Sequence, residues 1–153
     1  MEEMEIKSGE STVVGSSQQI VLPMEIMVRP LEEIDGLPVE VGAAPATLWL
    51  RISQHKEFPI GYRHAWGTAH VSTREDGGDS FPVQSLRLQI TMPVPAGSPG
   101  GPLVSNEARG NAADCAADCK YNGVPPAIGD FSSRWDAWAT HPGYGTWTTG
   151  NHW

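Results

Sequence analysis

The sequence predicts a mainly β protein: an antiparallel β-sandwich or small barrel with long loops rich in proline and glycine and one or two short helices. Along Thr47–Ser53 the aliphatic residues Leu48, Leu50 and Ile52 alternate with Trp49 and Arg51, and along Ser85–Thr91 apolar residues alternate with polar ones. This pattern is typical of half-buried strands, because successive side chains of a strand point to opposite faces. The chain has 17 glycines and 13 prolines among 153 residues, a content that disfavours long helices. Its length suffices for one domain with its own core.

The acidic residues are concentrated near the amino terminus. The chain carries a net charge of −8, and the first 40 residues contain nine acidic and two basic residues. We interpret residues 1–19 as an acidic polar arm, 20–130 as a β-sandwich core domain and 131–153 as a tryptophan-rich extension. The arm is either a solvated face or a segment that contacts a basic patch on a neighbouring subunit. We expect no direct nucleic-acid binding, because such binding depends on Lys and Arg.

The first strand is predicted over Ile20–Val28. Pro23 within it indicates a strand at the edge of a sheet, because proline has no N–H to donate to a neighbouring strand. Leu31–Asp35 has the length of a single helical turn, and Val39 and Val41 indicate the start of another strand.

A longer strand is predicted over Tyr62–Val71. One of its faces carries Ala65, Gly67, Ala69 and Val71, and the other carries His64, Trp66, Thr68 and His70. The small residues predict that another layer of the structure approaches the first face closely. Farther along, Pro93–Pro102 contains four prolines and three glycines, which predicts an extended loop without regular structure.

Two short helices are predicted in the second half of the chain. The first covers Asn111–Lys120, where Ala-Ala-Asp-Cys occurs twice in succession and alanine favours a helix. The second covers Arg134–Thr140, because Ser133 and Asp136 have the spacing of a helix-capping box.

Cys115 and Cys119 are four residues apart, so on a helix they would share a face. Three alternatives stay open: packed or free thiols, a disulfide between the two, and a metal site. Asp114 and Asp118 flank the cysteines, but ligands from one turn cannot close a tetrahedral site. We therefore predict no metal ligands and no cofactor.

The histidines give little support for catalysis. His64 and His70 would lie on one face of a strand about 20 Å apart, at ~3.3 Å per residue, so a shared ion would need a bend at Gly67. Thr68-Ala69-His70 and residues 97–104 resemble the histidine and serine motifs of chymotrypsin-type proteases, yet Pro99 stands at the nucleophile position. We expect no catalytic residues, and we keep a small enzyme that uses His64 or His70 as an alternative.

Aromatic residues gather at the carboxyl end, where four of the six tryptophans fall in the last 19 residues. They finish the core, form a subunit interface or stack on sugars, since tryptophan is enriched at binding hot spots. The candidate interface or ligand residues are Trp135, Trp138, Tyr144, Trp147, His152 and Trp153.

These observations favour a non-catalytic structural subunit of a large assembly. The most concrete form is a phage-like virion decoration, cement or minor structural protein that grips neighbouring subunits, of its own or another kind, through its terminal arms. The alternative is a β-sandwich carbohydrate-binding module that binds a glycan with its C-terminal aromatics. No apolar run reaches the ~20 residues needed to cross a membrane, and the start lacks the features of a signal peptide. We expect synthesis in the cytoplasm and a final location in the virion or another extracellular particle.

Overall fold

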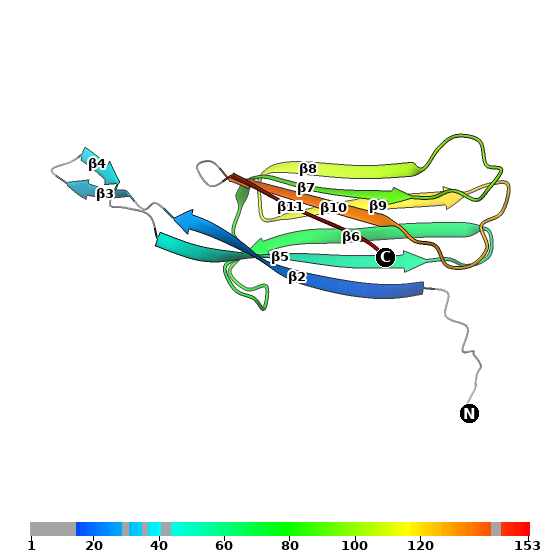
Figure 1. Cartoon of the computed structure of the whole chain (residues 1–153), viewed down its shortest axis with the longest axis horizontal. Coiled ribbons are helices and arrows are strands. Elements are labelled where there is room, and N and C mark those ends of the chain that lie inside the picture. The colour runs from blue at the N-terminus through cyan, green and yellow to red at the C-terminus, as the bar shows by residue number, and fades with distance from the viewer. Residues whose placement is uncertain (1–14, 29–30, 35–36, 41–43, 142–144) are drawn as a thin grey trace, which may run out of the picture.

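Two antiparallel four-stranded sheets pack face to face as a β-sandwich in this computed structural model (Figure 1). The structure describes residues 15–28, 31–34, 37–40, 44–141 and 145–153. The first sheet has the order β2 (Gly15–Val28), β5 (Ala44–Glu57), β6 (Tyr62–Ser72) and β9 (Asp114–Asn122). The second has the order β11 (Gly145–His152), β10 (Arg134–His141), β7 (Val83–Met92) and β8 (Leu103–Ala112). The predicted mainly β sandwich is confirmed.

The predicted alternation determines which face of each central strand enters the core. The predicted strands Thr47–Ser53, Tyr62–Val71 and Ser85–Thr91 lie within β5, β6 and β7. Their apolar parity is buried, and the second half of the chain contributes with the same period of two. The buried residues of these strands and of β9 and β10 include Leu48, Leu50, Ile52, Ala65, Ala69, Val71, Leu86, Leu88, Ile90, Cys115, Ala117, Cys119, Trp135, Ala137 and Ala139.

The two sheets are in close contact at Gly67. Trp135 of β10 is 1 % exposed, and its indole N–H donates a hydrogen bond to Oγ of Ser133 over 2.6 Å. A Cβ added to Gly67 would lie 2.7 Å from Cζ3 of Trp135 and would also collide with the carbonyl oxygen of Ser53. The indole therefore fills the space that the missing side chain leaves, as the small residues of this face predict.

The helix predictions are wrong, and no helix occurs among the described residues. Asn111–Lys120 spans the end of β8 and most of β9, and Arg134–Thr140 lies in β10. Leu31–Asp35 contains the four-residue strand β3 (Leu31–Ile34) in place of a helical turn. Helix propensity is a weak preference that packing overrides. In β9 the small residue Ala117 is the register partner of Gly67, beside which the Trp135 ring packs.

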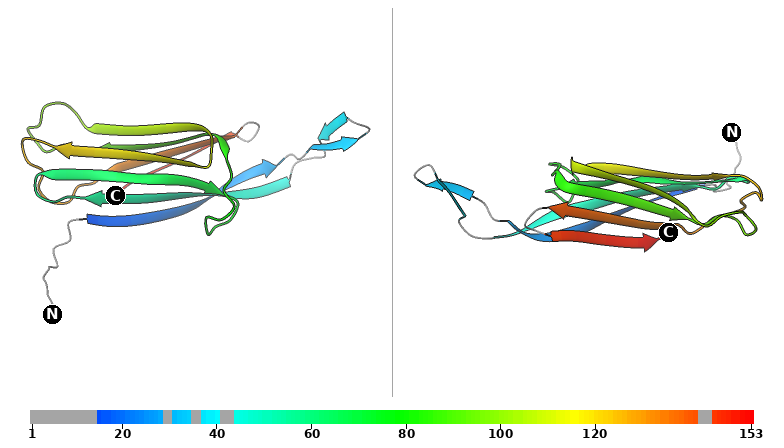
Figure 2. Two further views of the ribbon diagram at one scale, coloured as in Figure 1. Left: turned by 180° about the vertical axis from the view of Figure 1, so that it is seen from behind. Right: turned by 90° about the horizontal axis from the view of Figure 1, so that it is seen from above.

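A β-hairpin projects from the sandwich. β2 and β5 pair along all of Gly15–Val28 and Ala44–Glu57, and β3 pairs with β4 (Leu37–Glu40) in a separate two-stranded sheet. Figures 1 and 2 show this small sheet beyond the end of both four-stranded sheets. Val39 lies in β4, as predicted, whereas Val41 and residues 1–14 lie outside the described residues.

The region 131–153 supplies two strands of the second sheet. β10 pairs with β7 on one side and with β11 on the other. Residues 15–19, which the sequence analysis places in the acidic arm, belong to β2. Pro23 lies in β2 at the edge of the first sheet, as predicted.

The contact at Gly67 generates a stability prediction. Gly67→Ala is expected to lower the free energy of unfolding by about 2–3 kcal/mol, as overpacked cores do, because the new methyl group meets backbone and a buried ring. Urea unfolding measures this loss as a lower midpoint. Gly101→Ala is the matched control, since a Cβ there meets nothing within 4 Å. Equal midpoints for the two variants would contradict the close approach.

Candidate interaction surface

Hydrogen bonds between side chains of β8 and the backbone of β9 close the side of the sandwich that these two edge strands form; we call it the sealed side. Oγ of Ser105 on β8 accepts a bond from the backbone N–H of Asp118 on β9 over 2.9 Å. Oε1 of Glu107 accepts one from the N–H of Ala116, and Oε2 of Glu107 lies 3.0 Å from Arg109. The bond from the N–H of Ala116, followed by the interaction with Arg109, holds the pKa of Glu107 below its ordinary value of 4.5. Edge N–H groups of β9 are thus already satisfied within the chain.

The opposite side, between the edge strands β2 and β11, is open. A groove of about 430 Å³ runs between them. Its lining combines apolar residues of the first sheet with the middle of β11: Leu22, Pro23, Met24, Leu50, Thr146, Trp147, Thr148 and Thr149. Trp147 is half-buried and packs against the core. An apolar groove beside an unpaired strand edge is the arrangement that peptide strands bind by strand addition.

A polar cluster closes the far end of the open side. Lys56 is buried, and its Nζ donates a hydrogen bond to the carbonyl oxygen of Phe131 over 2.7 Å and lies 3.1 Å from Asp130. The ammonium group also lies 4.9 Å from the centre of the Trp153 ring. Backbone bonds of 2.9 Å in both directions tie Trp153 to Ser133. The carboxyl-terminal tryptophan therefore covers a charge in the core.

The buried side-chain amide of Gln54, beside this cluster, has a hydrogen-bond partner for only one of its two polar atoms among the described residues. Gln54 is 0 % exposed, and its Nε2 donates to Oδ1 of Asn151 over 2.9 Å. Its Oε1 has no hydrogen-bond partner among the described residues. The bond to Asn151 joins β5 to β11 across the open side.

The outer face of the first sheet carries a histidine–tryptophan row. Nδ1 of His64 lies 3.1 Å from Glu57 and its Nε2 lies 2.9 Å from Asp118. The rings of His64 and His55 both stack on Trp66, with centroids 4.1 and 5.4 Å apart. Both nitrogens of His64 are thus engaged by carboxylates of the neighbouring strands β5 and β9.

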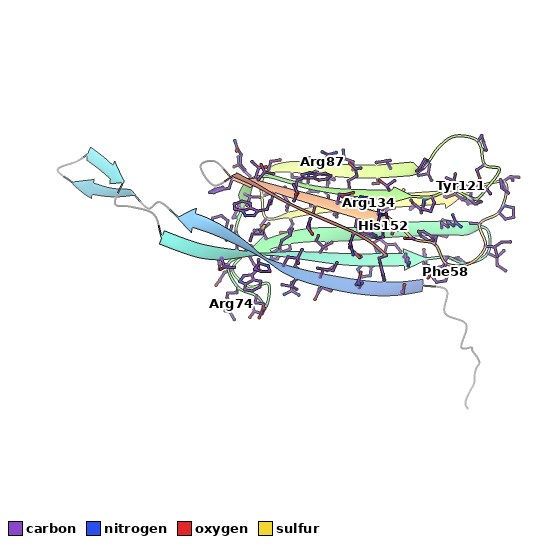
Figure 3. The ribbon with its side chains drawn as sticks, viewed as in Figure 1. Phe58, Arg74, Arg87, Tyr121, Arg134 and His152 are labelled. Atoms are coloured by element: carbon purple, nitrogen blue, oxygen red, sulfur yellow. The ribbon has the colours of Figure 1, made fainter. Side chains whose placement is uncertain are left out.

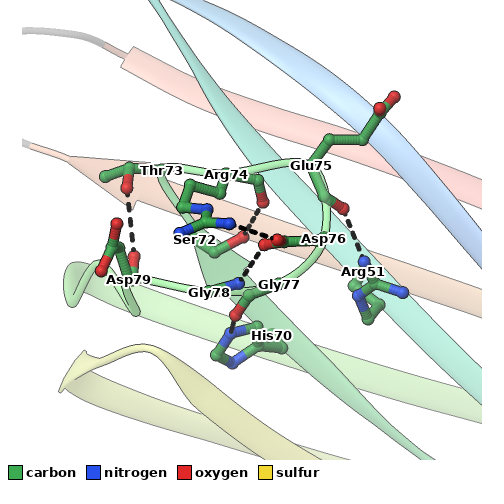
Figure 4. Close-up of polar contacts among 10 residues, drawn as sticks. All are labelled: Arg51, His70, Ser72, Thr73, Arg74, Glu75, Asp76, Gly77, Gly78 and Asp79. Atoms are coloured by element: carbon green, nitrogen blue, oxygen red, sulfur yellow. Dashed lines mark hydrogen bonds and ion pairs between the residues drawn. The ribbon is translucent and has the colours of Figure 1, made fainter.

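The side chain of His70 holds the loop that follows β6 against the sheet. Its Nδ1 lies 2.6 Å from Asp114. Its Nε2 lies 2.9 Å from the carbonyl oxygen of Gly77 (Figure 4). Arg51 donates to the carbonyl oxygen of Glu75 in the same loop over 2.6 Å. The sequence prediction that His64 and His70 share a face agrees with the exposed parity of β6, but each has its own carboxylate partners.

The same loop is held internally by Asp76. Its Oδ1 accepts the backbone N–H of Gly78 over 2.8 Å, and its Oδ2 lies 2.6 Å from Arg74 (Figure 4). The bond from Gly78, followed by that from Arg74, lowers the pKa of Asp76 below its ordinary value. These contacts give the loop a defined shape.

The two cysteines are free and buried, so the disulfide alternative is not realised. Cys115 and Cys119 lie on the inner face of a strand, where four residues span about 13 Å, and a disulfide requires Cα atoms within ~7 Å. Burial raises the pKa of Cys115 to about 12 and that of Cys119 to about 11. Both are packed thiols of the core.

The predicted C-terminal candidates do not converge on one surface. Trp135 is in the core, Trp147 lines the groove and Trp153 covers Lys56. Trp138 lies on the outer side of the second sheet, with the Arg87 guanidinium 4.3 Å from its ring centre. His152 lies 3.2 Å from Arg134 (Figure 3), and Tyr144 lies outside the described residues.

Two kinds of feature, a metal-binding cluster and a membrane-spanning helix, are absent from the described part of the chain. It contains no group of three or more His, Cys, Asp or Glu residues placed to hold a metal ion. None of its segments is a helix long and apolar enough to cross a membrane.

The molecule is a β-sandwich with one sealed side, one open side and a projecting hairpin. No family model, no curated protein and no solved structure matches the chain. Its function therefore has to be inferred from its own geometry. The open side could not be recognised in the sequence, because it depends on sheet order, and Pro23 as an edge signal was the clue available for it. The hairpin had a local signal, the turn-forming pair Asp35-Gly36 between the segments that become β3 and β4.

The buried thiols are expected to be unreactive in the native protein. At neutral pH both stay protonated, because their pKa values of about 12 and 11 lie far above it, and the thiolate is the reacting form. Ellman's reagent should detect no thiol in the folded chain and two after unfolding in guanidinium. Fast labelling without denaturant would show that β9 does not face the core as described.

The hydrogen bond that Glu107 of β8 accepts from the backbone of β9 is expected to weaken in acid. A carboxylate with a lowered native pKa stabilises the fold above its unfolded pKa and loses this effect as the pH falls through the native value. Glu107→Gln should therefore cost about 1 kcal/mol at pH 7, within the usual range for a hydrogen bond. The difference from wild type should shrink below pH 4.5. Glu75→Gln is the control, and a pH-independent difference for Glu107→Gln would contradict the mechanism.

Proposed function

We propose that this protein is a non-catalytic structural subunit of a larger protein assembly, which it joins through the projecting hairpin and the open side of the sandwich. The most concrete setting is a phage-like virion, with the chain as a decoration, cement or minor structural protein. The virion setting rests on analogy with the type of chain, a rigid sandwich that holds out binding segments.

The observation that carries this proposal is the hairpin. Met24 of β2 and its register partner Leu48 of β5 are buried. Beyond them β2 and β5 continue as a pair to Val28 and Ala44, and β3 and β4 follow as a sheet of two strands. An isolated two-stranded hairpin is only marginally stable in water. A projecting one is expected to gain its stability by packing against a neighbour.

The charge of the hairpin indicates the kind of surface it would contact. Residues 29–43 contain four acidic residues and a single basic one, Arg29. Complementary potentials speed association and suppress wrong partners. A protein surface with a basic patch is therefore the expected partner, consistent with the role predicted for the acidic amino-terminal region.

The alternatives have weaker support from the geometry. A carbohydrate-binding module would need several accessible rings on one face, whereas the C-terminal tryptophans occupy the core, the groove and two different surfaces. An enzyme built on His64 or His70 would need convergent free groups in a concave site. Both nitrogens of each histidine are already engaged by acceptors that hold strands and a loop together.

The proposal is tested by shortening the hairpin. Val28 and Ala44 are direct register partners, so residues 29–43 can be replaced by Asn-Gly, which closes a two-residue hairpin turn. The intact protein should form assemblies whose native mass is a multiple of the chain mass. The shortened protein should keep the same urea midpoint and form smaller assemblies.

Two results would contradict the proposal. One is an intact protein that stays monomeric at every concentration in native mass spectrometry and sedimentation. The other is a shortened protein that assembles to the same mass as the intact one.

A further inference from the structure

The two sheets have four outer edges, and three of them carry features that block pairing with another strand. β2 contains Pro23, which cannot donate a backbone hydrogen bond. β9 carries charged residues, and N–H groups of its edge are bonded to Ser105 and Glu107 of β8. β8 itself carries the Glu107–Arg109 ion pair. Charges, prolines and covered edges are the usual protections against edge-to-edge association.

The fourth edge, β11, shows none of these protections within the part of the chain that the structure describes. Its sequence, Gly-Thr-Trp-Thr-Thr-Gly-Asn-His, contains no proline and no Asp, Glu, Lys or Arg. One side of β11 is paired with β10 over eight residues, from Gly145 opposite His141 to His152 opposite Arg134. The other side is the end of the sheet. The right-hand view of Figure 2 shows β11 along the outer border of the molecule.

The space beside β11 suits an added strand. Neighbouring strands lie about 4.8 Å apart, so a strand paired with β11 would lie over the groove between β11 and β2. Its inward side chains would meet Leu22 and Met24, which line that groove together with Trp147. Exposed Thr146 and Thr148 would extend the outer face of the sheet.

We infer that β11 pairs with β11 of a second copy of this chain, antiparallel and about a two-fold axis, joining the two second sheets into one sheet of eight strands. This inference rests on the proposed function and names its first partner. A register centred on Thr148 would place Thr148 opposite itself and Trp147 opposite Thr149. Such pairing keeps the inward residues of both copies on the same side, because directly opposite residues of antiparallel strands share a face.

The lack of charge is what favours a second copy as the occupant. In an isologous pair each residue near the axis meets its own equivalent or a close neighbour, and like charges directly opposite each other are destabilising. β9, with Asp114 and Asp118, would suffer this repulsion, whereas β11 would not. Threonine pairs across strands are favourable, and they would form the centre of this contact.

The first experiment places a charge at the centre of the contact. Thr148→Lys is expected to put two ammonium groups opposite each other and to weaken self-association at least tenfold, measured by sedimentation equilibrium. Ala108→Lys is the matched control, because Ala108 is also exposed and lies on β8, at the opposite edge of the same sheet. The control should associate like the wild type.

The second experiment traps the pair. Thr148→Cys should form a disulfide-linked dimer under mild oxidation, whereas Ala108→Cys should not; the native cysteines are buried and do not compete. The protein shortened at the hairpin should still form this dimer. If hairpin shortening lowers the assembly mass but neither substitution at Thr148 changes self-association or cross-linking as described, the β11 contact is overturned. The proposed function then still stands. If the Thr148-dependent dimer forms but the larger assemblies keep their full mass after hairpin shortening, the β11 contact is supported and the role of the hairpin is contradicted.

Discussion

The fold depends on the contact between the Trp135 indole and the bare backbone at Gly67. This large ring is set among small residues, with Ala65 and Ala69 on the facing strand and Ala137 and Ala139 on its own. The contact brings the two sheets close together at this point, and Trp135 belongs to β10, an inner strand of the second sheet. The carboxyl-terminal region is therefore integral to the core, although its unusual content of tryptophan suggests a separate extension when only the sequence is considered.

The fold class followed from the sequence wherever the hydrophobic period was unambiguous. Leu48, Leu50 and Ile52 alternate with Trp49 and Arg51, and Leu86, Leu88 and Ile90 alternate with Arg87 and Gln89. All six aliphatic residues are buried. The errors arose where alanine occupied the core positions. Cys115, Ala117 and Cys119 also alternate, but alanine has high helix propensity and carries little hydrophobic signal. The tertiary need for small residues opposite Trp135 decided the outcome, and no local pattern expresses that need.

The candidate surface was less accessible to sequence reasoning than the fold. His64 and His70 were correctly placed on one strand face, but their partners Glu57, Asp118 and Asp114 come from two other strands, and the registers of those strands cannot be read from spacing. The sealed and open sides likewise depend on sheet order. Pro23 identified one edge because proline has a local physical meaning, whereas β11 is recognisable as an edge only after the topology is known.

The unbroken pairing of β2 with β5 has a mechanical consequence. A pull on the hairpin tip acts on both strands in the same direction, so the load passes to the neighbouring strand β6 along the strand axis. β5 and β6 are joined over nine residue pairs, from Trp49 opposite Ser72 to Glu57 opposite His64. In this shear geometry the pairs bear the force together and do not open one after another like a zipper. A subunit held by its hairpin would therefore resist tearing more strongly than one held by a loop.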